Sequence, residues 1–521
     1  MSDTAVLTRE RVLFLATGLA GSFLVTLSAQ FVSANIADVQ GGTGLSADEA
    51  SWITTVYTMA SFAGIIASGT LIRALGPSRY AAANALVFGA MALACAGGGP
   101  LWLLLTFRAL QGLAAGSFGP LAFVAVFMVM GGPRLAFGLV LLSFVLLFPT
   151  TLGPIVSGFV QDAFGWRSLF LIQAGIGGVL ALAAFAWLPR PPVNRAALKT
   201  DWAALTLLSI GLAALMLVLS QGTRRFWFEN EVVTWAAAAA LGATAGFVFL
   251  ARFSPLPVIA PALLLNRRFG VPITLNLVFR AGFALSTWLI PQFLALTQGY
   301  RPLQIAELLL WAAVPQALAL PLVWWLLHRL DSRIVMGSGL LLCGLGAALV
   351  MDGTSLVAGE QFRWALMLFG TGQLLFLAPD LLVGAGALKP ADLPTASIAF
   401  NVTTTGGTTL GVALVSHFAT EREKFHSSFL TEAVSLYATA PAERIAAMAN
   451  ALGSRLVDDA GAARQAVALL AAAVRREAWV LSFNDAFLVL GAVLILGALG
   501  VIAIGASKPL PRRTSVTGDL P

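Results

Sequence analysis

The stretch LAFGLVLLSFVLLFPTTLGPIVSG, residues 135–158, contains no charged side chain. A helix needs about 20 mainly apolar residues to cross the hydrocarbon core of a bilayer, so this stretch predicts a membrane span. The rest of the chain has the same character, because 58% of its 521 residues are hydrophobic and only 11% are charged. Soluble domains carry roughly 25% charged residues. The composition therefore indicates a protein that exposes apolar side chains to lipid.

The same criterion predicts thirteen further spans, and hence an all-α polytopic membrane protein with fourteen spans. The first of them follows Arg9 and Arg11, and its apolar stretch is too long for the core of a signal peptide. The predicted spans lie at 12–38, 49–72, 80–99, 101–128, 135–158, 167–188, 202–220, 232–252, 269–293, 303–327, 333–352, 361–386, 393–419 and 478–504.

The basic residues favour one orientation of these spans. With the N-terminus in the cytoplasm, most Lys and Arg residues fall in the inner segments, as the positive-inside rule requires. The short outer loops then hold only Arg167, Arg224, Arg225, Arg301 and Arg363. Both termini are therefore predicted to be cytoplasmic. The net charge of +7 reflects this topology, since no clustered soluble basic face suggests nucleic-acid binding.

Polar interruptions divide the chain into six spans, two spans and six spans. The segment 420–477 is the largest piece between spans, and its Ala-rich, charged pattern predicts one or two short amphipathic helices outside the membrane. The predicted parts are an N-terminal six-span bundle at 1–190, a linker with two extra spans at 191–268, a C-terminal six-span bundle at 269–506 that includes the outer segment, and a cytoplasmic tail at 507–521.

Several kinds of chemistry are excluded by missing patterns. Cys95 and Cys343 both lie in apolar runs, which argues against a disulfide framework or a cysteine metal site. The three histidines lie far apart and lack the spacing of metal ligands. No phosphate-binding loop of the Gly-x-x-x-x-Gly-Lys-Ser/Thr kind occurs, so the chain is not expected to hydrolyse ATP.

Short motifs along nearly the whole chain resemble one family. Span four reads FRALQGLAAG at 107–116, and FGTGQ at 369–373 in span twelve is a weak internal echo of it, as a duplicated six-span half predicts. Span five contains Leu152-Gly153-Pro154 with Gly158, and span six begins FGWRSLF at 164–170. Further matches are Ser51-Trp52 with Tyr57, Glu421-Arg422-Glu423 with His426, and Asn484-Asp485-Ala486-Phe487. In their order and spacing these motifs resemble the fourteen-span drug:proton antiporters of the major facilitator superfamily, the EmrB/QacA type.

The resemblance implies a fold, an activity and partners. The fold is two six-helix bundles with two extra central spans. The activity is proton-coupled export of hydrophobic or amphipathic organic compounds across the bacterial inner membrane, driven by the proton motive force and without a cofactor. The resemblance also implies a periplasmic adaptor and an outer-membrane channel as partners, and segment 420–477 is the natural place to test for them.

The sequence departs from the family pattern at positions that carry charge in relatives. Gln30 stands five residues before Asn35, where the family usually has an aspartate in the first span. Arg73 replaces an aspartate in the loop after span two, and span thirteen lacks an arginine near Thr404. If the span-one carboxylate carries the proton in relatives, another group must do so here.

Five ionisable residues inside or at the ends of spans are the candidates for proton coupling: Arg108, Arg280, Glu307, Asp380 and Asp485. Ionisable groups cost several kcal/mol in the hydrocarbon unless they are paired, hydrated or face protein. Glu307 and Asp380 are the candidate proton carriers, and Arg280 is expected to neutralise one of them. The structural alternatives are helix packing for Arg108 and Asp485 and a position at the membrane interface for Glu307.

Other residues are candidates for gating and for lining a cavity. Gly153, Pro154 and Gly158 form the antiporter motif and are expected to shape a bend in span five. Gln30, Gln111, Trp311 and Gln373 are expected to line an interior cavity for an amphipathic solute. The alternative for the tryptophan is the aromatic belt at the membrane interface.

Two other functions stay open at this point. The missing aspartates leave room for the uptake or facilitated movement of one small metabolite. A membrane enzyme or sensor is the alternative of another class, but the clustered His, Asp or Glu residues that such an enzyme needs are not found in the sequence.

Overall fold

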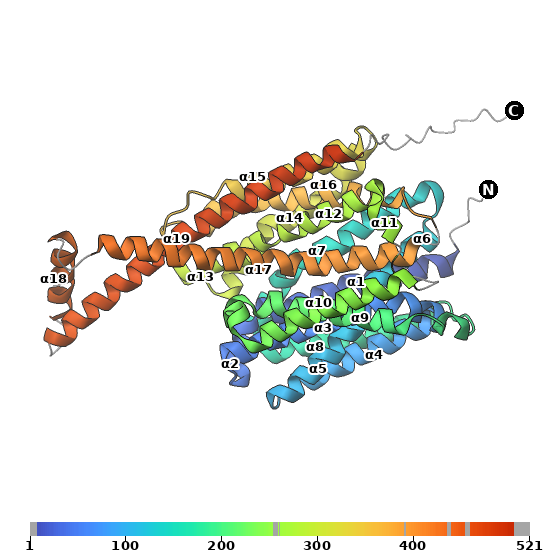
Figure 1. The fold of residues 1–521 in the computed structure, drawn as a ribbon, viewed down its shortest axis with the longest axis horizontal. Coiled ribbons are helices and arrows are strands. Elements are labelled where there is room, and N and C mark those ends of the chain that lie inside the picture. Colours follow the sequence, from blue (N-terminus) through green and yellow to red (C-terminus); the bar gives the residue numbers. More distant parts are fainter. Residues whose placement is uncertain are drawn as a thin grey trace.

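The computed structural model describes residues 8–253, 259, 261–389, 392–434, 439–453 and 459–504. Within these ranges the regular elements are helices, and they form an elongated bundle (Figure 1). The α-helices are α1 Arg9–Ala34, α2 Ile36–Thr43, α3 Ala47–Leu75, α4 Pro77–Ala96, α5 Leu101–Ala115, α6 Phe118–Val129, α7 Leu135–Phe164, α8 Trp166–Trp187, α9 Trp202–Gln221, α10 Glu231–Phe253, α11 Pro261–Leu265, α12 Arg267–Ala281, α13 Ile290–Gln298, α14 Pro302–Leu327, α15 Ser332–Ala348, α16 Arg363–Ala385, α17 Leu393–Ala433, α18 Thr439–Gly453 and α19 Asp459–Gly500.

Thirteen helical segments among the described residues are long and apolar enough to cross a membrane. They correspond to thirteen of the predicted spans. The remaining prediction, 333–352, falls on α15, which is apolar but only 17 residues long. This helix packs closely on both of its neighbours, because Gly339 lies against the backbone of α16 and Gly344 against that of α19. The fourteenth predicted span is therefore a shorter helix within the bundle.

Two predicted spans are interrupted. The span at 101–128 is divided into α5 and α6 at Gly116 and Ser117. The span at 269–293 contains α12, a π-helical turn at Leu285–Leu289 and α13, which runs on to Gln298. Such interruptions in a membrane helix are tolerated where the backbone is surrounded by protein. Leu285 and Leu289 are both fully buried, in agreement with that requirement.

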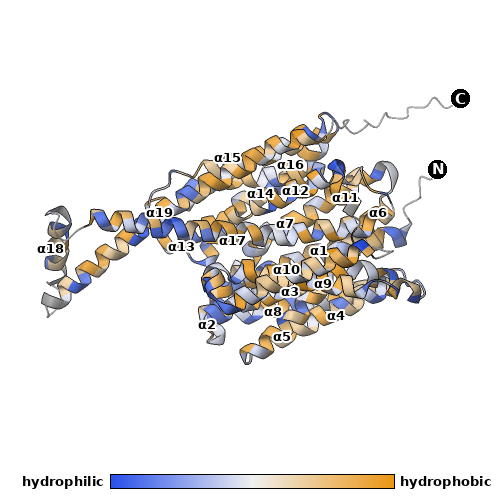
Figure 2. Cartoon of the chain, in the orientation of Figure 1, coloured by the Kyte–Doolittle hydropathy of each residue, from blue (hydrophilic) through white to orange (hydrophobic). Residues whose placement is uncertain are grey.

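The two ends of the bundle differ in what they carry. Helix α1 begins and α19 ends at one end, here called the terminal end, whereas α18 stands beyond the opposite end, here called the α18 end (Figure 1). Hydrophobic residues line most of the length of the bundle helices, and hydrophilic residues gather in the connections at both ends (Figure 2). This distribution is that of helices crossing an apolar layer.

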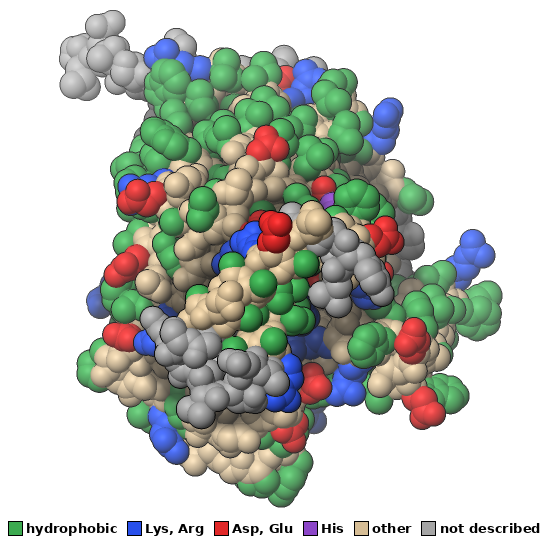
Figure 3. All heavy atoms as spheres, turned by 90° about the vertical axis from the view of Figure 1, so that its left-hand side faces the viewer, with side chains coloured by type: hydrophobic (Ala, Val, Ile, Leu, Met, Phe, Trp, Pro, Cys, Tyr) green, Lys and Arg blue, Asp and Glu red, His purple; other side chains and the backbone are tan. Residues whose placement is uncertain are grey.

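The segment 420–477 differs from its prediction. Helix α17 continues to Ala433 and α19 begins at Asp459, so two bundle helices extend far beyond the α18 end (Figure 1). Among the described residues of this segment only α18 is a separate helix, and the Ala-rich stretch at 462–474 belongs to α19. Helical propensity continues across the charged residues here, so the helices do not stop where hydropathy falls. The face at this end carries acidic and basic side chains scattered among hydrophobic ones (Figure 3).

The two six-span halves meet along helices that contribute small residues. Helix α7 of the first half packs on α14 of the second half, where a Cβ at Gly158 would lie 2.8 Å from Cβ of Ala306. On another side of the bundle α3 and α6 of the first half contact α17 of the second. Close approach through small residues is the usual way in which membrane helices pack.

Candidate proton-coupling site

Asp380 is the only buried carboxylate among the residues that the structure describes. It follows Pro379 in α16, towards the terminal end, and only 2% of its surface is exposed. Its Oδ1 atom has no hydrogen-bond partner within the described protein. A buried carboxylate without such partners is costly when ionised. Its protonation is therefore sensitive to hydration and to nearby cations.

The cation that interacts electrostatically with Asp380 is Arg280 on α12, which is 1% exposed. Its Nε and Nη2 atoms lack hydrogen-bond partners within the described protein. The guanidinium lies 5.3 Å from the ring centre of Phe283, which gives it a cation–π contact. Gly407 of α17 makes room for this side chain, since a Cβ there would lie 2.7 Å from Cβ of Arg280. The structure thus brings together two candidates that are 100 residues apart in sequence.

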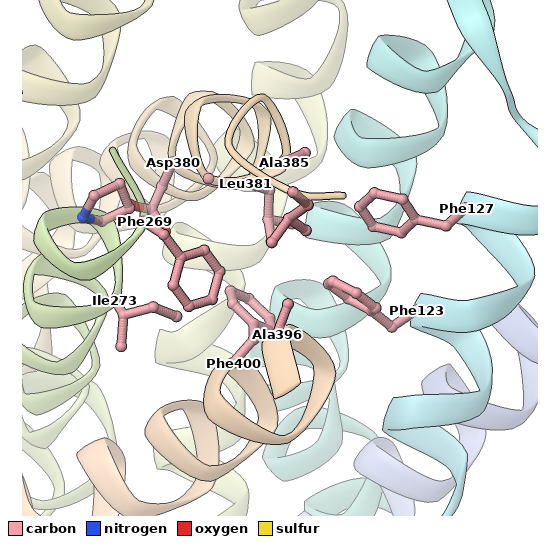
Figure 4. A pocket seen from close by; sticks show the side chains of 12 residues that line it. Phe123, Phe127, Phe269, Ile273, Asp380, Leu381, Ala385, Ala396 and Phe400 are labelled. Carbon is pink, nitrogen blue, oxygen red and sulfur yellow. The ribbon is translucent and has the colours of Figure 1, made fainter. Parts of the chain in front are cut away.

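A small cavity lies beside Asp380, between the two halves of the molecule (Figure 4). Phe123 and Phe127 of α6 line it from the first half, and Phe269 of α12 and Phe400 of α17 line it from the second. Its volume of about 20 Å³ is enough for roughly one water molecule. None of the four phenylalanines was a sequence candidate, because nothing distinguishes them from the other apolar residues of their spans.

Unpartnered polar atoms extend the site through the second half. Asn276, one turn before Arg280, donates from Nδ2 to Thr403 Oγ1 at 3.0 Å. Gln316 donates from Nε2 to Gln373 Oε1 at 2.8 Å. The buried polar atoms of α12, α14, α16 and α17 that have no partner within the described protein are Asn276 Oδ1, Arg280 Nε and Nη2, Gln316 Oε1, Gln373 Nε2, Asp380 Oδ1, Ser397 Oγ and Thr404 Oγ1. Each costs roughly 1–3 kcal/mol without a partner, so this interior is suited to exchange with water, protons or a polar ligand.

Arg108 lies in a separate polar cluster inside the first half. It is 1% exposed, its Nη1 donates to Gln111 Oε1 at 2.6 Å, and its Nε donates to the Ile53 carbonyl at 3.3 Å. Gln111 in turn donates to Gln173 at 2.8 Å, and the guanidinium stacks 4.2 Å from the ring centre of Tyr57. Among the described residues Arg108 makes no ion pair with a carboxylate. This neutral environment corresponds to the structural alternative, in which the arginine joins α3, α5 and α8.

Asp485 joins two of the motif segments that lie far apart in sequence. Its Oδ2 atom accepts hydrogen bonds from Arg422 Nε at 2.6 Å and from His426 Nε2 at 2.8 Å. Asn484 next to it accepts a bond from the Gly353 amide at 3.1 Å. The motif residues of α17 and α19 therefore bind one another at the α18 end, where the side chains of Arg422 and Asp485 are about a third exposed. They correspond to the helix-packing alternative for Asp485.

Glu307 and Trp311 lie on the outer surface of α14. Glu307 is exposed near the start of the helix. Trp311 is 41% exposed and stacks with Arg363, whose guanidinium lies 5.1 Å from the ring centre. The expectation that Trp311 lines an interior cavity does not agree with this position. Hydropathy alone could not distinguish the two faces of this span, because α14 is apolar nearly all round.

We expect the substitution Glu307→Gln to leave transport unchanged within about twofold. The side chain is exposed on α14 and its charge does not act on Arg280 in the structure. The measurement is substrate-dependent proton movement in reconstituted vesicles, compared with the wild type at equal protein density. A loss of coupling in this variant would return Glu307 to the list of proton carriers.

The antiporter motif and Gln30 lie at one helix contact. A Cβ at Gly153 of α7 would lie 2.5 Å from Cβ of Gln30 on α1, so the half-buried glutamine packs directly on the glycine. Helix α7 is continuous through Pro154, and Gly158 packs on α14 of the other half. Asn35 nearby donates to Ser157 at 2.8 Å. The motif thus positions α7 between α1 and the second half. Gln30 lies at this contact as an uncharged side chain.

Arg73, the other departure from the family pattern, is exposed in the last turn of α3. Its Nε donates to the carbonyl of Gly69 at 3.0 Å. A basic residue in the last turn of a helix interacts favourably with the helix dipole. Among the described residues, no interaction connects Arg73 with Asp380.

Two sets of apolar helices, with the buried Asp380 of the second set at a cavity between them, fit a membrane transporter that works by alternating access. The sequence model of the Major Facilitator Superfamily matches residues 18–287, which is more than half of the chain. The chain belongs to this superfamily.

Similar proteins agree with that assignment. The chain is 23% identical to the multidrug export protein EmrB of Escherichia coli, over 94% of each chain. It is 25% identical to the colistin resistance protein EmrB of Acinetobacter baumannii, over 76% of this chain and 78% of that one. Among solved structures, the proton:xylose symporter XylE shares its fold with a TM-score of 0.58 at 10% identity, over 96% of this chain and 97% of that one. A peptide transporter, POT, aligns with a TM-score of 0.57 at 16% identity, over 94% of each chain.

Proposed function

We propose that this protein exports hydrophobic or amphipathic organic compounds across the bacterial inner membrane in exchange for protons. The observation that carries the proposal is the buried Asp380, which lies at a cavity between the two halves and interacts electrostatically with the buried Arg280. The relatives named for multidrug export and for colistin resistance support the substrate class. The proton motive force supplies the energy, and no cofactor takes part.

The proton step follows from the electrostatics of the pair. An ionised Asp380 attracts Arg280, and a protonated Asp380 does not, so the two protonation states favour different distances between α12 and α16. Opening to one side of the membrane changes the hydration of the cavity, and hydration changes the affinity of the carboxylate for its proton. Proton binding and the movement of the halves are thereby coupled.

The orientation and the partners belong to the same proposal. With the terminal end in the cytoplasm, the extended parts of α17 and α19 and the helix α18 project into the periplasm (Figure 1). A helical projection of this kind is suited to contact with a periplasmic adaptor, which would link the pump to an outer-membrane channel.

The experiment that tests the proposal uses the purified protein in vesicles with an imposed pH gradient. The probes are ethidium and tetraphenylphosphonium as lipophilic cations and oleate as a weak acid. We expect at least one probe to move against its gradient and to dissipate the pH gradient as it moves. Probe movement without proton flux would support facilitated transport of a specific solute, and the absence of both would contradict the proposal.

A further inference from the structure

The two extra helices α9 and α10 lie beside the seam, which is the contact between α3 and α6 of the first half and α17 of the second. Helix α9 contacts both α3 of the first half and α17 of the second. Near the terminal end, Ile66 of α3, Leu205 of α9 and Ile398 of α17 belong to one apolar cluster. Further along, a Cβ at Gly406 of α17 would lie 3.8 Å from Met216 of α9. Helix α9 therefore follows the seam over much of its length.

At the α18 end, hydrogen bonds attach α9 to the first half. Gln221 is the last residue of α9 and is 1% exposed. Its Nε2 atom donates to Thr55 Oγ1 at 2.8 Å and to Ser51 Oγ at 3.1 Å, both on α3. A buried amide held by two hydroxyls is costly to separate, because each group would lose its partner in an apolar environment. This end of α9 is therefore fixed to α3.

The loop after α9 makes a different contact, with the second half. Trp227 donates from Nε1 to Nδ1 of His417 on α17 at 3.0 Å, and the two rings meet edge to face with 5.0 Å between their centres. Gly222 makes room for the indole, since a Cβ there would lie 2.7 Å from the ring. Among the described residues, this is the hydrogen bond that joins the loop to α17.

The backbone of this loop is strained. Phe226 and Trp227 have φ angles of 57° and 53°, and they are the only residues other than glycine with positive φ among those described. The left-handed region is unfavourable for residues with a Cβ, and such strain persists only where the surroundings hold it. The bond to His417 holds Trp227 from the second half, and packing on Gly222, Val218 and Val233 holds it from α9 and α10. Of these contacts, only the bond to His417 has to break when the second half moves away.

We propose that α9 and α10 move with the first half and that the Trp227–His417 contact is a releasable latch to the second half. Alternating access in this fold moves one bundle against the other, so a contact across the seam must open in part of the cycle. The Gln221 contacts lie within one moving unit and stay closed. The latch closes the seam at the α18 end in the conformation seen here. The proposal assigns a role to the two extra helices, and it does not depend on which solute is carried.

The test measures distances between spin labels in the full chain in lipid nanodiscs. Cysteines are introduced at exposed positions: Asp48 at the start of α3, Glu229 in the loop after α9 and Lys424 on α17. The native Cys95 and Cys343 are buried and need not be removed. Pulsed electron paramagnetic resonance then measures the distance between labels 229 and 424, across the latch. It also measures the distance between labels 48 and 229, within the unit proposed to move with the first half.

We expect two distances for the pair 229–424 and one distance for the pair 48–229. Trp227→Phe keeps an aromatic ring and removes the donor, and we expect it to raise the ratio of the open to the closed population about three- to tenfold. The matched control is Trp235→Phe on α10, an exposed tryptophan at which no change is expected. A single distance across the latch that is insensitive to Trp227→Phe would overturn the proposal, as would equal changes in both pairs.

Discussion

Asp380→Asn is expected to abolish the coupling between proton and solute movement, with a loss of at least about 100-fold in solute-dependent proton flux. Asp380 is the only buried carboxylate among the described residues, and it lies at the cavity between the halves. Asparagine has nearly the same shape but cannot exchange a proton. The charge that acts on Arg280 therefore no longer changes with proton binding. The measurement is fluorescence of a pH indicator inside vesicles after addition of a transported probe.

Three comparisons separate coupling from folding in this variant. Exchange of labelled for unlabelled probe across the membrane without a pH gradient should persist in Asp380→Asn, because the path for the solute is intact. Glu307→Gln is the matched control, since it removes a carboxylate from the exposed face of α14. Removing one partner of a buried charge pair is itself destabilising. The double variant Asp380→Asn with Arg280→Gln should therefore be more stable than the single variant but equally uncoupled. Full retention of proton flux in Asp380→Asn would exclude this residue as the proton carrier.

Gly112→Ala is expected to prevent the close approach of α3 and α5 and to lower the yield of folded protein sharply. A Cβ at Gly112 would lie 2.2 Å from the carbonyl oxygen of Tyr57, and the contacting atoms belong to the backbone. The two helices would have to separate, at a cost of about 1–3 kcal/mol or more. Separation also displaces Tyr57, whose ring lies over the buried Arg108. The measurement is the thermal unfolding midpoint in detergent, together with the monodisperse fraction on size exclusion.

Gly242→Ala on α10 is the matched control for this prediction. No atom lies within 4 Å of a Cβ at that position, so the added methyl group faces open space. Alanine is favoured over glycine in a helix by about 1 kcal/mol. We expect the unfolding midpoint of Gly242→Ala to be unchanged or raised. A normal midpoint for Gly112→Ala would show that α3 and α5 can separate without loss of the fold.

Much of the fold follows from the sequence because a membrane span is a local property. The apolar stretch at 135–158 must form a helix in lipid whatever it packs against, since only a helix satisfies its own backbone there. The limits of this reasoning lie where protein replaces lipid as the surroundings. Helix α15 is shorter than a usual span and packs through Gly339 and Gly344 on α16 and α19. Helix α19 continues through charged residues from Asp459, which hydropathy could not predict.

The candidate site, like the fold, could be predicted from the sequence only in part. Each ionisable residue in an apolar stretch is conspicuous by its cost in lipid, and this made Arg108, Arg280 and Asp380 candidates. The sequence could not show that Asp380 and Arg280 act on each other or that Arg108 is surrounded by neutral amides. It could not show that Trp311 faces outward. These outcomes depend on helix rotation and on contacts between distant spans.

For this protein, the sequence by itself determined that the chain spans a membrane many times, in two halves with two extra helices between them. It also marked a few buried charges. The tertiary structure decided which of these charges meet, and that α9 lies along the seam beside α3 and α17. The physical reason is that lipid sets the hydropathy and approximate length of each helix one at a time. The burial of a carboxylate beside an arginine, and a hydrogen bond such as that of Trp227 with His417, exist only after the helices have packed.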